Sequence, residues 1–157
     1  MINRNDVLAL IKNASSIIPA EAIEDLPPKE FKDVPQWHKF EYEIWDLGEK
    51  VKQLLVRDPL LRKDQDIEKG ILDVAMNSKA KRGRQSFVLL LGSVKHAHLA
   101  KNIVTTLFDE NVNGHVIDAL LKMRAGNYVE KVKPFTSSDV TWIRNKAKKY
   151  CERYGRL

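Results

Sequence analysis

The C-terminal half of the chain repeats one apolar spacing in VIDALLKM (residues 116–123) and IRNKAKKY (residues 143–150), with a weaker copy in FVLLLGSV (residues 87–94). In each copy the apolar side chains stand at positions i, i+4 and i+7, which places them on one face of an α-helix. The copies begin 29 and 27 residues apart. A second apolar pair recurs after 29 residues, with Leu99 and Ile103 corresponding to Tyr128 and Val132. Two apolar stripes per period predict stacked pairs of antiparallel helices.

The rest of the chain also favours helices. A first helix is expected to begin with Asp6 as its N-cap, and Asp64 is expected to cap a later one. Between them, apolar residues at helical spacing run from Gln36 to Arg57, and Asp58-Pro59 should end that helix. Four of the six prolines fall in residues 17–35, which are therefore predicted to be an irregular connection. No stretch alternates like a strand, so the sequence predicts an all-α fold.

Five helices are predicted in the repeated part, at residues 82–92, 96–107, 113–125, 127–134 and 139–154. Glycine follows or ends several of these ranges, at Gly92, Gly126 and Gly155. A glycine in the left-handed conformation often terminates a helix, so we expect these three to be C-terminal caps.

Charge divides the chain into two unequal halves. Residues 1–78 contain 11 Lys and Arg against 15 Asp and Glu, whereas residues 79–157 contain 16 against six. We interpret residues 1–157 as a single helical domain with an acidic N-terminal part and a basic, repeat-like part. A basic surface attracts acidic partners, either protein or nucleic acid.

Composition restricts the class of protein. Apolar residues make up 43% and charged residues 31%, which is typical of a globular chain. The single cysteine, Cys151, excludes an internal disulfide and a cysteine-based zinc site. No apolar run is long enough to span a bilayer, and no apolar segment follows the polar first residues. We expect a soluble, cytoplasmic protein with no membrane partner.

The stretch SDVTWIRNKA (residues 138–147) resembles the entry into an inner helix of the HEAT-like repeat family, in its short-period form. The copy NVNGHV (residues 111–116) keeps the apolar positions but is followed by Ile117 where that pattern has Arg. The resemblance covers residues 82–155. It implies a right-handed superhelix of antiparallel helix pairs that binds protein or nucleic acid, and one branch of the family removes alkylated bases from DNA. An irregular α-helical bundle is the alternative architecture.

The densest group of cations surrounds Gly83 and comprises Lys79, Lys81, Arg82 and Arg84. It coincides with the expected start of a helix, where backbone N–H groups are free. Cations combined with free N–H groups favour a phosphate or carboxylate site. The alternative is a solvated loop beside the acidic N-terminal half.

A second basic set lies on the last predicted helix and comprises Arg144, Lys146, Lys148, Lys149, Arg153 and Arg156. Together with cations of neighbouring turns it could neutralise phosphates in a stripe, although a terminal helix also needs a soluble outer face. Trp142 stands beside Arg144 at the helix entry, where the pair could receive a base, a ring or a peptide. Packing against the preceding repeat is the other interpretation of Trp142.

Catalytic and cofactor motifs are missing from the sequence. There is no glycine-rich phosphate loop, and no acidic residue or cysteine stands near His96 and His98 in the sequence to complete a metal site. Asp118 stands in the middle of a predicted helix and is interpreted as the partner of a nearby Lys or Arg. The sequence therefore predicts a non-enzymatic, cofactor-free protein-binding module, of adaptor or inhibitor/immunity type, with a basic face for an acidic partner. Sequence-nonspecific nucleic-acid binding, related to DNA repair, is the alternative, and the oligomeric state is left open.

Overall fold

The computed structural model describes residues 3–28 and 34–155, and all regular structure in these residues is helical. This confirms the all-α prediction. The chain divides into two compact units, Met1–Phe87 (unit 1) and Val88–Leu157 (unit 2). Each unit is described by itself.

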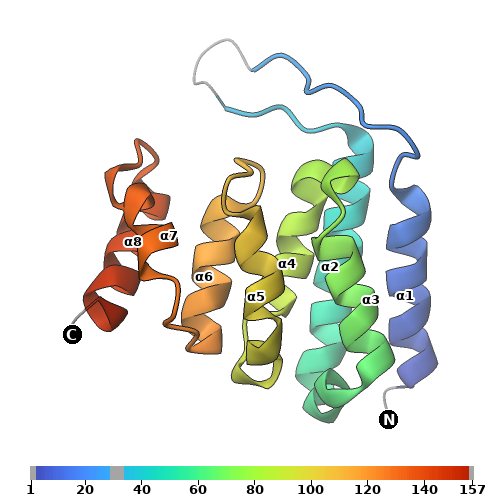
Figure 1. Cartoon of the computed structure of the whole chain (residues 1–157). Helices are drawn as coiled ribbons and strands as arrows, with labels where there is room; N and C mark the ends of the chain where they lie inside the picture. Colours follow the sequence, from blue (N-terminus) through green and yellow to red (C-terminus); the bar gives the residue numbers. More distant parts are fainter. Residues whose placement is uncertain (1–2, 29–33, 156–157) are drawn as a thin grey trace. The chain divides into compact units, whose positions relative to one another are not determined.

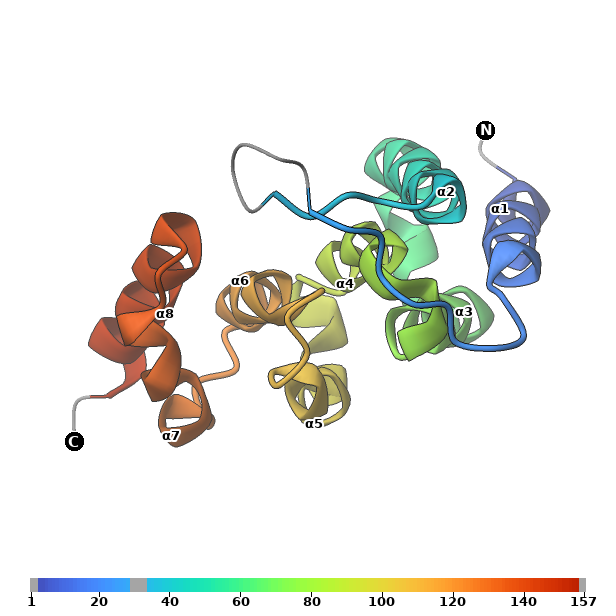
Figure 2. The same ribbon diagram turned by 90° about the horizontal axis from the view of Figure 1, so that it is seen from above.

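Unit 1 is built on three helices, α1 (Arg4–Ile17), α2 (Lys39–Arg57) and α3 (Gln65–Ala75), which alternate in direction (Figure 1). Seen along their axes in Figure 2, they form a triangle around a shared core. Each helix contributes one apolar stripe to that core, including Val7, Ile11, Ala14, Ile44, Val51, Leu55, Ile67, Ile71 and Val74. The expected spacing is therefore the packing face of each helix.

The boundaries of these helices follow side-chain chemistry. Helix α2 ends at Asp58-Pro59 as predicted, with Asp58 as its C-cap, and Pro59 begins a 3₁₀ turn. Asp64 caps α3, because its carboxylate accepts hydrogen bonds from the N–H groups of Asp66 and Ile67. The prediction for α1 was wrong. Asn3 rather than Asp6 is the N-cap, since the Asn3 side chain accepts a hydrogen bond from the N–H of Asn5.

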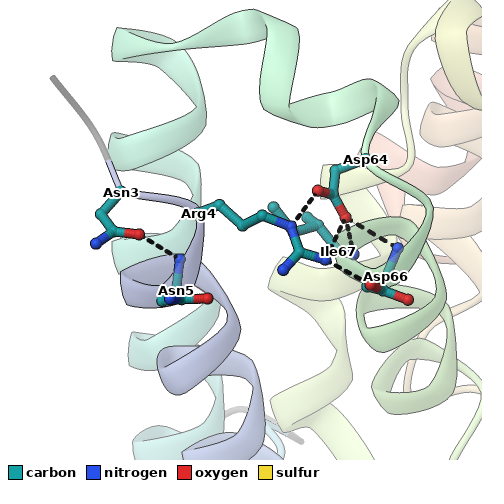
Figure 3. A network of polar contacts seen from close by, with 6 residues as sticks. All are labelled: Asn3, Arg4, Asn5, Asp64, Asp66 and Ile67. Atoms are coloured by element: carbon teal, nitrogen blue, oxygen red, sulfur yellow. Dashed lines mark hydrogen bonds and ion pairs between the residues drawn. The ribbon is translucent and has the colours of Figure 1, made fainter.

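One arginine joins the first turns of α1 and α3, as Figure 3 shows. Arg4 Nε donates to Asp64 Oδ2 at 2.6 Å, and Arg4 Nη2 donates to Asp66. The hydrogen bond from Arg4 is the main reason that the pKa of Asp64 lies below its usual value. One carboxylate thus caps α3 and also holds the start of α1 against it.

Unit 2 contains α5 (Ala100–Ile103), α6 (Asn113–Met123), α7 (Val129–Val132) and α8 (Thr141–Tyr154), and α4 (Gln85–Leu90) crosses the boundary between the units. All five lie within the predicted ranges, but only α6 and α8 fill most of theirs. The other ranges combine short α-turns with 3₁₀ turns, among them Val94–Leu99, Val104–Thr106 and Lys133–Ser137. In the last of these Pro134 lacks an N–H group and cannot continue an α-helix.

The repeated apolar positions differ in burial. The six in α6 and α8 are all buried: Val116, Leu120, Met123, Ile143, Ala147 and Tyr150. In the first copy Phe87 and Leu91 are buried but Val94 is exposed, because α4 ends at Leu90. Repeat-like packing is consistent with this pattern, and membership of the HEAT-like family stays a prediction.

α6 and α8 pack side by side and run in the same direction, since Gly114 contacts Trp142 and Asp118 pairs with Lys146 one turn further along both helices. The approach is close. A Cβ atom at Gly114 would lie 2.4 Å from the Trp142 ring, and one at Gly126 would lie 2.4 Å from the Tyr154 ring.

Of the three glycines expected as C-terminal caps, Gly155 is the C-cap of α8, whereas Arg124 rather than Gly126 is the C-cap of α6. No glycine in residues 3–28 and 34–155 has a positive φ, and Arg124 (φ 57°) is the left-handed residue at the end of α6. Gly114 and Gly126 are required instead because a side chain at either position would collide with an aromatic ring.

Replacing Gly114 by alanine tests this packing. Alanine is the better helix former, so helix propensity alone predicts a gain in stability. The collision with Trp142 instead predicts that Gly114→Ala lowers the free energy of unfolding by about 1–3 kcal/mol. Chemical denaturation gives the sign, and the double variant Gly114→Ala/Trp142→Ala should recover part of the loss. A more stable Gly114→Ala protein would contradict the close approach.

Candidate functional site: a basic groove in unit 2

The four cations around Gly83 all make polar contacts within unit 1. Lys81 Nζ pairs with Asp25 Oδ1 at 2.6 Å, and Arg82 Nη1 lies 3.9 Å from the same oxygen. Only 13% of the Lys81 and Arg82 side chains is exposed. Arg84 is buried and donates from Nε to the carbonyl oxygen of Lys81, while the exposed Lys79 donates to the carbonyl oxygen of Ala20.

These contacts hold an exposed segment, residues 20–28, which we call the acidic strap. Besides the bonds from Lys79 and Lys81, the strap receives a contact from His38 Nε2 to the carbonyl oxygen of Glu24 at 2.7 Å. The hydrogen bond from Lys81 is the main reason that the pKa of Asp25 lies below its usual value. Lys81 and Arg82 thus have a carboxylate partner within unit 1, and a phosphate or carboxylate ligand for the cluster stays a prediction.

Loss of the Asp25 carboxylate should loosen the strap. Asp25→Asn removes the pairing with Lys81 and Arg82, so we expect faster amide exchange and earlier proteolysis in residues 20–28. Glu21→Gln, a change at an exposed acid of the same segment, is the matched control and should leave both rates unchanged. Equal exchange in the two variants would show that Asp25 does not hold the strap.

Unit 2 carries the whole charge excess of the chain. Val88–Leu157 contains 12 Lys and Arg against six Asp and Glu, so its net charge of +6 equals that of the full sequence. The four cations around Gly83 belong to unit 1. The net positive charge predicted for the C-terminal half therefore belongs to unit 2.

Five of these cations line one hollow of about 500 Å³, which we call the basic groove. They come from α6 and its C-cap, and from one face of α8: Lys122, Arg124, Lys146, Lys149 and Arg153. Asp118 is the one carboxylate of the lining, and Gly92, Val94 and Leu121 form its apolar part. The groove thus has a large excess of positive charge beside a small apolar surface.

Asp118 organises the groove. Its carboxylate accepts Lys122 Nζ at 3.0 Å and Lys146 Nζ at 2.9 Å, and only 13% of its side chain is exposed. Burial by itself would raise the pKa of Asp118, but the hydrogen bonds from Lys146 and Lys122 outweigh burial and leave the pKa below its usual value. The interpretation of Asp118 as a cation's partner is confirmed, and the pair links α6 to α8.

The structure separates the cations that the sequence grouped together on α8. Lys149 lines the groove with Lys146 and Arg153, at positions i, i+3 and i+7. Lys148 is exposed but turned about 200° around the helix from Lys146. Arg144 faces the same way as Lys148 and donates to the carbonyl oxygen of Ser138 at 2.8 Å. Of the six cations predicted on this helix, the groove contains Lys146, Lys149 and Arg153, and Arg156 lies outside the described residues.

Arg124 occupies an unfavourable backbone conformation in this groove. Its φ and ψ of 57° and 37° lie in the left-handed region, which costs a non-glycine residue about 1 kcal/mol. Its N–H donates to the carbonyl oxygens of Leu120 and Leu121 and so closes α6. Glycine would relieve this strain but would remove a cation from the groove. Strain of this kind often marks a functional position.

Trp142 stands at the start of α8 and combines packing with exposure. Its ring lies over Gly114 and meets His115 edge-on, with 5.1 Å between ring centroids. Even so, 43% of Trp142 remains exposed. Burial lowers the pKa of His115 to about 4, despite the opposing effect of Asp118. Both interpretations of Trp142, packing and exposure to a ligand, are thus compatible with its position.

The neutral state of His115 predicts a specific pH dependence. Its pKa falls from 6.5 in the unfolded chain to about 4 in the folded one, so the unfolded chain binds more protons between these values. We expect unit 2 to lose up to about 3 kcal/mol of stability as the pH falls from about 6.5 to 4. Amide exchange in α6 and α8 measures this loss, which His115→Gln should abolish.

The carboxylates with lowered pKa values affect stability below that pH range. Asp25, Asp64 and Asp118 all have pKa values lowered from 3.8, so the stability they contribute is lost only at lower pH. An unchanged slope between pH 6.5 and 4 in His115→Gln would therefore assign the effect to another group.

A metal site and a reactive cysteine have little support in the described residues. Within residues 3–28 and 34–155, no three His, Cys, Asp or Glu side chains are grouped so that they could hold a metal ion. Burial raises the pKa of the Cys151 thiol, which disfavours the nucleophilic thiolate. None of the helices in the described part of the chain is long and apolar enough to cross a membrane.

A search of protein-family models finds no match to this sequence, and comparisons with curated proteins and with solved structures find none either.

Proposed function

We propose that the protein is a non-enzymatic interaction module and that the basic groove of unit 2 binds an acidic segment of a partner protein. One observation supports this most directly: five Lys and Arg side chains line a single hollow with one carboxylate among them. That carboxylate already pairs with two of the five, Lys122 and Lys146. Arg124, Lys149 and Arg153 have no ion pair with any described carboxylate and remain available for an acidic ligand.

The strain at Arg124 supports the same proposal. A cation held in a conformation that glycine would prefer is understandable if its charge is needed in the groove. The contrast with unit 1 adds to this argument. There, Lys81 and Arg82 are largely covered and pair with Asp25, whereas Lys149 and Arg153 are exposed.

An acidic protein segment fits this groove better than a nucleic-acid backbone. The lining combines cations with Gly92, Val94 and Leu121, so a ligand with both carboxylates and apolar side chains would use all of it. Extended phosphate binding would favour a longer stripe, yet Arg144 and Lys148 lie on another face of α8. This proposal does not require the concave face of several repeats that a HEAT-like architecture would form.

Charge reversal in the full-length protein tests the proposal. A labelled oligo-glutamate peptide should bind the protein, and Lys149→Glu/Arg153→Glu should weaken binding at least about tenfold, since it replaces two attractive charges by repulsive ones. Raising the salt concentration from about 50 to 200 mM should weaken binding as well. Fluorescence anisotropy gives both affinities.

The control keeps the same change in net charge. Lys131→Glu/Lys148→Glu reverses two exposed cations outside the groove and should leave the affinity within about threefold of wild type. Equal losses in both double variants would point to nonspecific attraction and reject the groove. Tighter binding of a single-stranded oligonucleotide than of the peptide would favour the nucleic-acid alternative.

A further inference from the structure

The exposed face of α8 extends beyond the basic groove. Trp142, Lys146, Lys149 and Arg153 stand at positions i, i+4, i+7 and i+11, which place them within one narrow stripe of the helix. The buried stripe of Ile143, Ala147 and Tyr150 lies on a different side of α8. The cations of the groove and the Trp142 ring therefore belong to one continuous surface.

Trp142 offers that surface a rigid aromatic side chain. Gly114 and His115 support the ring on one side, while 43% of the residue is exposed. A large ring that is held in place before binding loses little side-chain entropy when a ligand covers it. Aromatic residues in such positions often contribute most of the binding energy of an interface.

Two further apolar side chains lie at the same end of unit 2. Phe108, which is 85% exposed, precedes α6, and the exposed Val140 is the N-cap of α8. Because α6 and α8 run in the same direction, the segments before them lie at the same end of the two helices, the upper end in Figure 1. We call Val140 and Trp142, which lie together at the start of α8, the apolar end. Exposed apolar groups next to a charged groove are typical of a protein interface.

We propose that the ligand of unit 2 is an acidic protein segment that also carries one large apolar side chain, which packs on Trp142 while its carboxylates enter the basic groove. This inference rests on the proposed function and specifies the partner. Trp142 precedes Lys149 by seven residues and Arg153 by eleven, which corresponds to about 10–16 Å along α8. An extended ligand spans that distance with about three to five residues.

The separation of charge from apolar surface favours a protein over a nucleic acid. Along α8 the apolar end and the cations occupy different stretches, and a protein segment can match this with carboxylates at one end and an apolar residue at the other. A nucleic-acid strand carries charge at every nucleotide and offers no uncharged end.

Labelled peptides and the full-length protein test the inference. Each peptide carries an acidic run, a Gly/Ser spacer of about one, four or ten residues and a terminal Phe or Ala, in both chain directions. The Phe peptide with the spacer of about four residues should bind about tenfold more tightly than its Ala counterpart, because a buried Phe side chain contributes roughly that factor. Trp142→Ala should remove the difference between Phe and Ala peptides while both still bind.

The variants separate the two proposals. Lys149→Glu/Arg153→Glu should weaken the Phe and Ala peptides alike, and Lys148→Glu should change neither. Val140→Ser alters an exposed side chain beside Trp142, so it keeps the fold and should reduce the advantage of the Phe peptide. The comparison of Phe and Ala peptides on the wild-type protein needs no variant and does not depend on the folding of Trp142→Ala.

Three results would overturn the inference. Equal affinities for Phe and Ala peptides, with dependence on Lys149 and Arg153 retained, would reject the apolar contact and leave the proposed function intact. No binding of any acidic peptide would reject the proposed function itself. An oligonucleotide that binds more tightly than the Phe peptide, and loses affinity in Trp142→Ala, would identify Trp142 as a base-stacking residue instead.

Discussion

The candidate site depends on how closely α8 can approach α6, and Gly114 sets that distance. With a hydrogen atom in place of a side chain, Gly114 lets the Trp142 ring lie directly on the α6 backbone. One turn further along, the same approach brings Lys146 to 2.9 Å from Asp118. Beyond that ion pair, Lys149 and Arg153 reach the groove beside Lys122 and Arg124. A single missing Cβ atom therefore positions both the apolar end and the cations.

The cations of the two units have different surroundings. In unit 1 the side chains of Lys81 and Arg82 are largely buried and form ion pairs with the carboxylate of Asp25. Their charge therefore helps to hold the acidic strap. In unit 2 a single carboxylate, Asp118, stands among five cations of the groove. A density of cations along the sequence is thus a poor guide to a binding surface. Whether cations are open to a ligand depends on whether the fold places acceptor groups of the same unit next to them.

Local chemistry could be predicted from the sequence, whereas long-range pairing could not. Asp58-Pro59 ends α2 and Asp64 caps α3 because each acts on its own neighbours in the chain. The apolar spacing likewise identified the buried faces of α6 and α8. By contrast, Lys81 meets Asp25 across 56 residues, and no spacing rule indicates that contact. Lys149 could be separated from Lys148 only after the packing of α8 on α6 had fixed which side of α8 faces the groove.

The groove is unfavourable for the free protein. Like charges gathered in one hollow repel each other, and Arg124 adds the strain of a left-handed backbone. Neither feature contributes to the core of unit 2, which α6 and α8 build from their buried stripes. An acidic ligand would offset the repulsion and would therefore bind the folded unit in preference to the unfolded chain. Binding of such a ligand would restore the stability that the groove costs the free protein.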